Sequence, residues 1–517
     1  MYTLNDKRWK KRYYVPMSDI RLPQDLRGVH IHFVGIKGTG MAALVEIFHH
    51  NGAVITGSDV SERFYTDEIL EKLNLKALEF SGKNITDDVQ YVIYSSAYKI
   101  DKNPDLIEAV RRGIPCLLYT QALGSYSAGA YSCGVCGVHG KTSTTGLTGT
   151  ILKELPVAAQ TLAGSIINSF GATCTYTSPL IKNLSEDSKK YFVAETCEYQ
   201  RHFMSFCPQK IILTSVESDH QDFYPTYESI RDAFVDYICR LPSGGELIYC
   251  ADDPGAVETA GIAAKKRNDI VMIPYGVKAD GDFKLVSSAV ENECQVFSCS
   301  LIPELKITVP GKHEVLDALA ATALACRILA ADKKNPLDYV EQIKKGLLNF
   351  TGGKRRSEKI GSFKTSSGNS VLVIDDYGHH PTAIKTTLEG YRQFYKGRKI
   401  IVDFMSHTYS RTQSLLKEFA SSFENADVVV LHKIYASARE NIADFNITGK
   451  TLYEQAKLYH KDVNYFEEIL DAVPFVKNLL EQDPGTNYPD GYLLVTMGAG
   501  DNWKLGKAII ENYGVNR

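Results

Sequence analysis

Short runs of apolar residues recur along the chain, and each is followed at once by glycine, serine or charged residues. Within the first 130 residues these runs occupy 30–34, 53–56, 91–94 and 116–119. A helical stretch at 41–50 separates the first two runs. Apolar runs of this length bounded by turn residues predict buried strands, and strands that alternate with helices predict a parallel sheet. We therefore expect an N-terminal Rossmann-like parallel sheet within residues 1–126.

The same pattern continues through the rest of the chain in two further blocks. Apolar runs of the middle block occupy 131–138, 190–194, 210–214 and 246–250. Those of the last block occupy 371–374, 399–404, 427–431 and 492–497. A chain of 517 residues is too long for one hydrophobic core, so we predict a three-domain α/β protein. A central P-loop ATPase-type α/β domain at 127–350 would be followed by a C-terminal Rossmann-like α/β domain at 351–517.

Composition and charge exclude several classes of partner. The net charge of −3 recruits neither nucleic acid nor an anionic membrane, and no apolar run approaches the length of a membrane span. The N-terminus lacks a signal-peptide core, and its basic run from Lys7 to Arg12 is expected to form a solvated arm. Most of the 11 cysteines lie in apolar segments, as reduced buried thiols do. We therefore expect a cytoplasmic protein without a nucleic-acid or membrane partner, and leave its oligomeric state open between monomer and homodimer.

The end of the run at 131–138 is typical of a phosphate-binding loop. It reads Gly137-Val138-His139-Gly140-Lys141-Thr142-Ser143. The glycines allow backbone N–H groups to surround phosphate oxygens, Lys141 adds positive charge, and Thr142 offers a hydroxyl to Mg²⁺. The spacing is one residue short of the eight-residue Walker pattern, because Val135 stands at its first glycine position. We predict that this loop binds ATP or GTP; a glycine turn followed by a chance Gly-Lys-Thr is the simpler alternative.

A second glycine-rich segment follows the first apolar run. It reads Gly35-Ile36-Lys37-Gly38-Thr39-Gly40, and Asp59 comes 19 residues after its last glycine. The glycine spacing is G-x-x-G-x-G and differs from the dinucleotide spacing G-x-G-x-x-G. Taken alone, the segment predicts only a backbone-lined diphosphate pocket at the carboxyl end of a strand.

Polar residues also stand at the carboxyl ends of two other predicted strands of the middle block. Glu195 follows the run at 190–194, and His220 lies a few residues beyond the run at 210–214. A carboxylate near Thr142 is a natural Mg²⁺ ligand, because Mg²⁺ prefers oxygen donors. A surface acid at the start of a loop and a structural histidine are the simpler alternatives.

The last block carries a dense cluster of acids, a phenol and imidazoles. Asp375-Asp376-Tyr377-Gly378-His379-His380 follows an apolar run directly, and the next run leads to His407 and Arg411. Such a cluster can bind a cation, hold an amine or shuttle protons. Arg355 and its neighbour Arg356 could reach phosphates, since arginine binds them bidentately, and a solvated basic pair is the alternative.

Ten short motifs, in the same order, resemble those of the Mur ligase family. They extend from about His30 to Lys504 and read HFVGIKGTGM, ITGSD, GVHGKTSTT, VAETCEYQRHF, ESDHQDFY, VPGKHEVLDALAA, FTGGKRR, DDYGHHPT, SHTYSRT and MGAGD. In that family the first domain binds the UDP-sugar, the middle domain binds ATP, and the last domain moves to close the cleft. Within the family, the motifs are most similar to those of the members that act on UDP-N-acetylmuramate and L-alanine.

The resemblance implies a role for each matching residue. The family positions that bind the UDP-sugar are matched by Gly35, Lys37, Gly38, Thr39, Gly40 and Asp59. The positions that hold the muramate end and the amino acid are matched by Tyr377, His379, His407 and Arg411. Positions that bind ATP are matched by Gly137, Val138, His139, Gly140, Lys141, Thr142, Ser143, His313 and Arg355 (or Arg356). Mg²⁺ ligands are matched by Thr142, Glu195 and His220. The catalytic residues would then be Lys141, His379 and Arg355.

The implied reaction is an ATP-driven amide synthesis for peptidoglycan precursors. The lactyl carboxylate of UDP-N-acetylmuramate would form an acyl phosphate, which the amine of L-alanine would attack, giving ADP and phosphate. ATP is thus expected as co-substrate and Mg²⁺ as the metal.

Three positions depart from the usual family pattern. Ser215 stands where the family typically has asparagine near the metal, and Glu314 and Asp317 replace two asparagines associated with adenine. We expect adenine to be held by fewer side-chain donors here. Both acids are expected in the first turn of a helix that starts near Val315, where they would favour the helix dipole.

Three other functions are alternatives to this one. A ligase of the same family that attaches a recycled tripeptide to the same sugar would share these motifs and differ in its amine pocket. A nucleotide switch would leave the cluster around Tyr377 without a role, and the chain has no guanine-reading Asn-Lys-x-Asp run. A nicotinamide-dependent oxidoreductase would leave Lys141 unexplained.

Overall fold

The fold comes from a computed structural model that describes residues 21–185, 188–221, 223–436, 440 and 442–514. The basic run from Lys7 to Arg12 lies outside the described residues. The chain divides into two compact units. The first unit comprises 1–216, 232–274 and 320–346, and the second comprises 217–231, 275–319 and 347–517.

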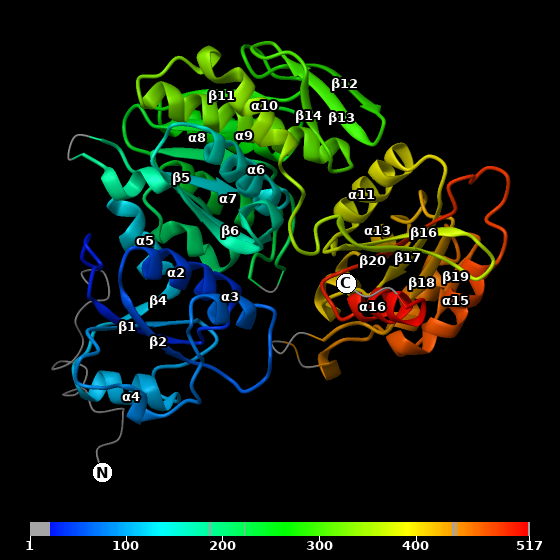
Figure 1. The fold of residues 1–517 in the computed structure, drawn as a ribbon, viewed down its shortest axis with the longest axis horizontal. Helices are drawn as coiled ribbons and strands as arrows, with labels where there is room; N and C mark the ends of the chain where they lie inside the picture. The colour runs from blue at the N-terminus through cyan, green and yellow to red at the C-terminus, as the bar shows by residue number, and fades with distance from the viewer. Residues whose placement is uncertain (1–20, 186–187, 222, 437–439, 441, 515–517) are drawn as a thin grey trace. The chain divides into compact units, whose positions relative to one another are not determined.

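A four-stranded parallel sheet begins the first unit, drawn in blue in Figure 1. Its strand order is β2-β1-β3-β4, from β1 (His30–Val34), β2 (Val54–Ser58), β3 (Tyr91–Tyr94) and β4 (Cys116–Leu118). Its helices are α2 (Thr39–His50), α3 (Asp67–Lys72), α4 (Pro104–Arg111) and α5 (Tyr119–Ala128). All four strands coincide with apolar runs of the sequence, and the predicted parallel sheet is confirmed.

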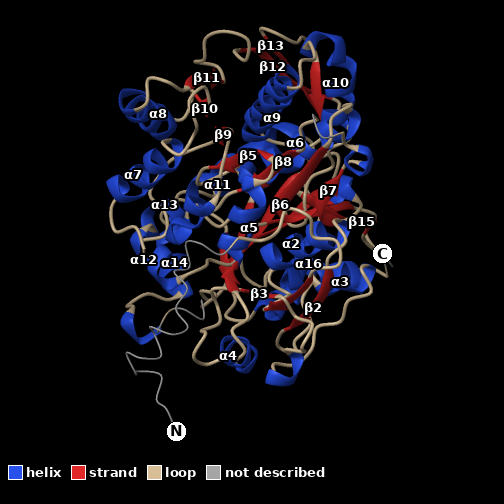
Figure 2. Ribbon diagram, turned by 90° about the vertical axis from the view of Figure 1, so that its left-hand side faces the viewer, coloured by secondary structure: helices blue, strands red, loops and turns tan. Residues whose placement is uncertain are grey.

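The second sheet has seven strands in the order β11-β10-β9-β5-β8-β6-β7. Its strands are β5 (Tyr131–Cys136), β6 (Ala159–Ile167), β7 (Thr173–Thr177), β8 (Tyr191–Glu195), β9 (Lys210–Leu213), β10 (Glu246–Cys250) and β11 (Val271–Tyr275). The accompanying helices are α6 (Lys141–Glu154), α7 (Tyr227–Ile238), α8 (Pro254–Lys266), α9 (Lys312–Ala331) and α10 (Val340–Leu348). Figure 2 shows helices flanking β5, β8 and β6, and the edge strand β7 pairs antiparallel with β6.

Helices α2 and α5 join these two sheets. Helix α2 packs on β6 and β7, where the buried Glu46 carboxylate accepts a hydrogen bond of 3.2 Å from the Cys174 N–H. Helix α5 runs directly from β4 towards β5, and a Cβ atom at Gly124 would lie 2.2 Å from the carbonyl oxygen of Ser205. The two sheets therefore meet across packed helices.

The hydroxyl of Tyr126 on α5 is a hub of this contact. It accepts hydrogen bonds from Asn51, at the end of α2, and from Lys190, and it donates one to Gln160 of β6. Because these partners lie at the end of α2 and in or beside the second sheet, one side chain ties α5 to α2 and to β6.

The second unit contains two sheets. An antiparallel sheet is formed by β12 (Leu285–Glu291), β13 (Cys294–Cys299) and β14 (Leu305–Ile307). The other has the order β15-β16-β20-β17-β18-β19, from β15 (Glu358–Lys364), β16 (Ser370–Asp376), β17 (Lys399–Phe404), β18 (Val428–Leu431), β19 (Val463–Tyr465) and β20 (Tyr492–Met497). Its helices are α11 (Pro381–Phe394), α12 (Tyr409–Ser414), α13 (Leu416–Ala420), α14 (Gly449–Ala456), α15 (Val473–Glu481) and α16 (Trp503–Asn512).

The six-stranded sheet is covered on both faces. Alternate strand residues such as Val402 and Ile401 belong to different buried clusters, one with α11, α13 and α14 and the other with α15 and α16. Only the edge strand β15 runs antiparallel to its neighbour among the pairs of this sheet that the described residues make. The C-terminal Rossmann-like prediction is confirmed.

One local expectation needs correction. Helix α9 begins at Lys312 and not near Val315, so Glu314 falls in its first turn but Asp317 falls in its second. The dipole effect decays within the first turn, and the capping role predicted for Asp317 is therefore wrong. Among the helices of the described ranges, none is both long and apolar enough to cross a bilayer.

Candidate active site

The phosphate loop lies between β5 and α6 and has the backbone that its glycines predict. Gly137 has φ +138° and Gly140 has φ +77°, both of which glycine adopts without a steric penalty. A Cβ atom at Gly137 would also lie 2.0 Å from the hydroxyl oxygen of Thr214. The loop therefore tolerates no side chain at Gly137, and it leads into the 14-residue helix α6, whose N-terminus favours anions.

Ser215 braces this loop from the neighbouring strand β9. Its carbonyl oxygen accepts a hydrogen bond of 3.0 Å from the N–H of Val138, and its hydroxyl accepts one of 2.9 Å from the N–H of His139. The departure from the family's usual asparagine thus falls on a residue that positions the loop backbone.

Lys141 folds back over the loop. Its Nζ donates to the carbonyl oxygens of Gly137 (2.6 Å) and Val138 (3.3 Å) and forms an ion pair with Glu198 (2.9 Å). Burial alone would lower the pKa of Lys141, but Glu198 counters it and the pKa is raised above its ordinary value. The lysine is therefore a permanent cation at the centre of the loop.

A carboxylate and a hydroxyl lie together beside the lysine. Glu195 accepts hydrogen bonds from the hydroxyl of Thr142 (2.9 Å) and from the N–H of Gly164 (2.7 Å). They meet because β5 and β8 are parallel neighbours in which Val135 pairs with Glu195. An oxygen pair of this kind suits Mg²⁺, so Thr142 and Glu195 fit the predicted metal.

The glycine-rich segment 35–40 is held by Asp59. One carboxylate oxygen accepts the N–H of Lys37 (2.7 Å), and the other accepts the hydroxyl of Tyr98 (3.0 Å) and the N–H of Val60 (2.8 Å). The Lys37 ammonium is turned to Asp67, 3.1 Å away. The segment leads directly into α2, and the first N–H groups of a helix have no intrahelical partner.

Three cavities of the first unit lie beside the glycine-rich segment 35–40. One of about 480 Å³ is lined by Lys37, Asp59 and their neighbours. Two smaller ones, of about 210 and 180 Å³, share Gly40, Tyr119, Thr120 and His202. The first of this pair adjoins Gly38 and Thr39, and the second reaches Glu195. Hollow space thus leads from the glycine-rich segment to the candidate metal carboxylate.

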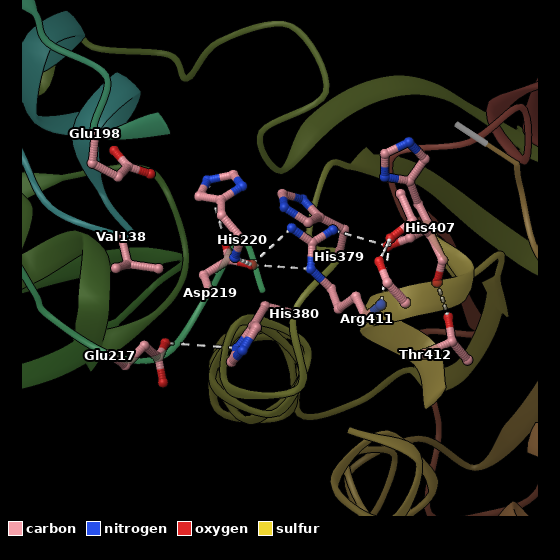
Figure 3. A network of polar contacts seen from close by, with 12 residues as sticks. Val138, Glu198, Glu217, Asp219, His220, His379, His380, His407, Arg411 and Thr412 are labelled. Carbon is pink, nitrogen blue, oxygen red and sulfur yellow. Dashed lines mark hydrogen bonds and ion pairs between the residues drawn. The ribbon is translucent and has the colours of Figure 1, made fainter. Parts of the chain in front are cut away.

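The second unit holds a cluster around Arg411, shown in Figure 3. Its guanidinium donates to Asp219 through Nε (3.2 Å) and NH2 (2.9 Å) and to the carbonyl oxygen of His407 through NH1 (2.9 Å). His220 adjoins Asp219, whose carboxylate lies 3.7 Å from the imidazole Nε2. Although burial opposes it, Arg411 and His220 hold the pKa of Asp219 below its usual range. The structure thus brings together His220, His407 and Arg411, which the sequence had separated.

His379 lies in the same cluster and is poised to accept a proton. Its Nδ1 is 2.9 Å from the carbonyl oxygen of Tyr377, which can only accept, so Nδ1 carries the hydrogen. Burial and the nearby Arg411 guanidinium hold the pKa of His379 well below its ordinary value. The ring is therefore neutral near pH 7, and its Nε2 has the lone pair.

Other members of the predicted cluster have structural partners. Asp375 binds the Arg355 Nε at 2.8 Å, and burial raises the pKa of Asp375 to about 6 although Arg355 opposes this. His380 accepts the Thr382 N–H at the start of α11. Arg355 also donates to the carbonyl oxygen of Gly498 (2.7 Å). These contacts hold the loops that carry Tyr377 and His379.

The remaining ATP candidates lie at two helix starts. Ser143 is buried in the first turn of α6, and His313 is the second residue of α9, its ring against Gly311. Arg356 differs from Arg355: its guanidinium lies 5.2 Å from the Tyr377 ring and has no hydrogen bond or ion pair with the described residues.

Sequence reasoning missed two residues of these clusters, Glu198 and Asp219. Both stood inside quoted motifs, each within three residues of a predicted ligand. The available signal was a second acid in the loop that already carries a predicted ligand at the end of a strand. Their cationic partners lie 57 and 192 residues away, so no local pattern could identify them.

Comparisons with known proteins identify the family of the chain. Three family models match in order: "Mur ligase family, catalytic domain" at residues 30–131, "Mur ligase middle domain" at 135–325 and "Mur ligase, glutamate ligase domain" at 355–500. The chain is 46% identical to a UDP-N-acetylmuramate–L-alanine ligase of Treponema pallidum (strain Nichols) over 95% of its length and 98% of the relative. It is 36% identical to the enzyme of the same name from Borreliella burgdorferi, over 92% of its length and 97% of the relative.

A solved structure supports the fold. The UDP-N-acetylmuramate–alanine ligase of Thermotoga maritima superposes with a TM-score of 0.71 at 24% identity, covering 94% of this chain and 99% of that one. With three models matched in sequence order and a relative of 46% identity spanning nearly the whole chain, the protein belongs to the Mur ligase family.

Proposed function

We propose that this chain is an ATP-dependent ligase that joins L-alanine to the lactyl carboxylate of UDP-N-acetylmuramate, giving ADP and phosphate. The observation that carries the proposal is the pair of cavities that lead from the glycine-rich segment to Glu195. A UDP-sugar held by its diphosphate at residues 35–40 would extend through them towards the phosphate loop. The names of the relatives support the same substrates. The role would be in cytoplasmic synthesis of peptidoglycan precursors.

The first chemical step makes a poor electrophile reactive. An oxygen of the lactyl carboxylate attacks the γ-phosphorus of ATP, the bond from that phosphorus to the β,γ-bridging oxygen breaks, and ADP leaves. Lys141 stabilises the negative charge on the phosphoryl oxygens. Mg²⁺ held by Thr142 and Glu195, with His220 as the third proposed ligand, would supply further charge neutralisation.

The second step forms the amide. The alanine amine attacks the acyl carbon, and the tetrahedral intermediate expels phosphate. We assign the amine's proton to Nε2 of His379, because the neutral ring with hydrogen on Nδ1 can accept it there. Tyr377, His407 and Arg411 would hold the amino acid and the muramate end.

Two assignments for ATP follow from the contacts. Arg355 is committed to Asp375 and to backbone carbonyl oxygens, so we favour Arg356 as the arginine that serves the phosphates. His313 would face adenine. Glu314 and Asp317 can accept a hydrogen bond from the adenine amino group, but as carboxylates they cannot donate to a ring nitrogen.

Phosphate release tests the proposal. The full chain is incubated with UDP-N-acetylmuramate, ATP and Mg²⁺, and each amino acid or the tripeptide L-alanyl-γ-D-glutamyl-meso-diaminopimelate is added in turn. We expect release with L-alanine that depends on the sugar nucleotide. Release with the tripeptide alone would assign the chain to the recycling ligases, and release without the sugar nucleotide would overturn the proposal.

A further inference from the structure

The ammonium of Lys141 is fully occupied within the protein. It has three hydrogens, and its contacts are the carbonyl oxygens of Gly137 and Val138 and both carboxylate oxygens of Glu198, at 2.9 and 3.2 Å. No hydrogen is left to point towards a ligand in the loop. A phosphate that binds Lys141 must therefore displace one of these partners.

Glu198 is the partner that a phosphate would replace. The two carbonyl oxygens belong to the loop itself and move with it, whereas Glu198 approaches from the segment after β8. Its side chain is only 2% exposed, so its charge is poorly screened by water. A nucleotide that brings further negative charge to Lys141 would face this carboxylate at short range.

We propose that Glu198 is a positioning residue that holds Lys141 when the phosphate loop has no nucleotide and yields it to the β- and γ-phosphates when ATP binds. The inference rests on the proposed ATP site. Carboxylate and phosphate compete for one cation, so Glu198 weakens nucleotide binding. After the reaction, the same carboxylate recaptures Lys141 and favours the departure of ADP and phosphate.

Nucleotide affinity tests the exchange directly. Calorimetric titration of the full chain with a non-hydrolysable ATP analogue and Mg²⁺ needs neither UDP-N-acetylmuramate nor alanine. Glu198→Gln keeps the shape of the side chain and removes the charge. We expect binding about 10- to 100-fold tighter, because one charged hydrogen bond no longer has to be exchanged. The dissociation rate of ADP, measured by stopped flow, should fall by a similar factor.

Glu246→Gln is the matched control. Glu246 is another buried glutamate, at the start of β10, and it is paired with Lys210 (2.6 Å) and Arg327 (2.7 Å) at the opposite ends of the strands. This variant should lose stability and leave nucleotide affinity unchanged. If both variants tighten binding equally, the effect is not specific to Lys141 and the inference fails.

A double mutant tests whether Glu198 changes nucleotide affinity through Lys141. In a Lys141→Met background, Glu198→Gln should lose most of its benefit, because Glu198 acts through the lysine. Equal or weaker binding by Glu198→Gln with an unchanged melting temperature would overturn the inference, as would no binding by any variant. Should Glu198→Gln not fold, Glu198→Asp retracts the carboxylate from Lys141 and should still tighten binding several-fold.

The outcome is separable from that of the proposed function. A wild-type chain that releases no phosphate with alanine would contradict the ligase reaction. Tighter nucleotide binding by Glu198→Gln would still stand.

Discussion

The two glycine-rich loops of the first unit share one architecture and use their lysines in opposite ways. Each loop follows a parallel strand and opens a helix. In the segment 35–40, the Lys37 ammonium is bound outside the loop by Asp67 and by the carbonyl oxygen of Glu62, at 2.9 Å from the latter. In the segment 137–140, the Lys141 ammonium lies over the loop's own carbonyl oxygens.

The first loop is therefore a fixed backbone cradle, and the second is a loop with a cation at its centre. Asp59 ties the first loop through the N–H of Lys37. The N–H groups of Gly35 and Gly38 donate to the carbonyl oxygens of Ser58 and Gly35, which leaves the N–H groups at the start of α2 for a ligand. The second loop adds a full positive charge that an acid outside the loop, Glu198, balances. A cradle suits a diphosphate that is held but not transferred, and a loop with a cation suits a phosphoryl group that changes charge during reaction.

Removing the cation of the second loop should have the largest effect. For Lys141→Ala we expect turnover to fall about 10³-fold or more, because charge on the transferring phosphoryl group loses its neutralising partner. Binding of UDP-N-acetylmuramate should stay within about threefold, since the first loop is unchanged. Phosphate release measures the turnover, and calorimetry measures the binding of UDP-N-acetylmuramate. Lys153→Ala, on the same helix, is the control, and loss of sugar-nucleotide affinity with turnover spared would reverse the assignment of the loops.

Breaking the brace of the first loop should give the converse result. In Asp59→Asn the carboxylate that accepts three hydrogen bonds becomes an amide. We expect about tenfold weaker binding of UDP-N-acetylmuramate and a free energy of unfolding lower by about 1–3 kcal/mol. Affinity for the ATP analogue should not change. Asp88→Asn, which alters a mostly exposed acid in the turn before β3, controls for the lost charge.

A metal test addresses the second loop alone, because the hydroxyl of Thr142 and the carboxylate of Glu195 lie beside it. Glu195→Gln should raise the Mg²⁺ concentration for half-maximal rate about three- to tenfold, since an amide oxygen carries no charge with which to compete against water. A magnesium titration of the rate measures this. An unchanged midpoint would remove Glu195 from the metal site, and Glu154→Gln at the far end of α6 provides the comparison.

The smallest expected effect concerns pH and the helix behind the first loop. Burial raises the pKa of Glu46 on α2 to about 7, from 4.5. The folded protein thus holds this proton more tightly than the unfolded chain, so the stabilisation is complete below pH 4.5 and is lost as the pH rises through about 7. In Glu46→Gln the free energy of unfolding should decline less between pH 5 and 8.5, by about 1–3 kcal/mol. Urea unfolding across that range decides it; parallel curves for the two proteins would contradict the shift.

Sequence pattern identified most of the buried strands, but it missed the buried β6, and it identified much less of the edges. Runs such as 492–497 form continuous apolar segments because helices cover both faces of their sheet. The exposed β12 and the edge strands β7 and β15 mix polar and apolar residues, and their pairing depends on neighbours distant in sequence. Pattern alone therefore gave no sign of them.

The candidate site shows the same limit. Thr142 and Glu195 could be placed together, because parallel strands bring their carboxyl ends to one edge. The ion pair of Arg411 with Asp219 spans 192 residues and depends on how whole segments pack. Arg355 illustrates the reverse case: its sequence suggested a phosphate ligand, and only the fold reveals the carboxylate of Asp375 beside it.

The packing of helix α5 limits where chimeras of this chain and its relatives can be joined. Gly124 admits no side chain against Ser205, and the Tyr126 hydroxyl bonds to Asn51 at the end of α2 and to Gln160 of β6. In a chimera joined between residues 118 and 131, α5 of one parent would pack against a surface of the other parent. A single methyl group at position 124 would then prevent this packing. We therefore expect a functional exchange between relatives to carry the first two sheets together.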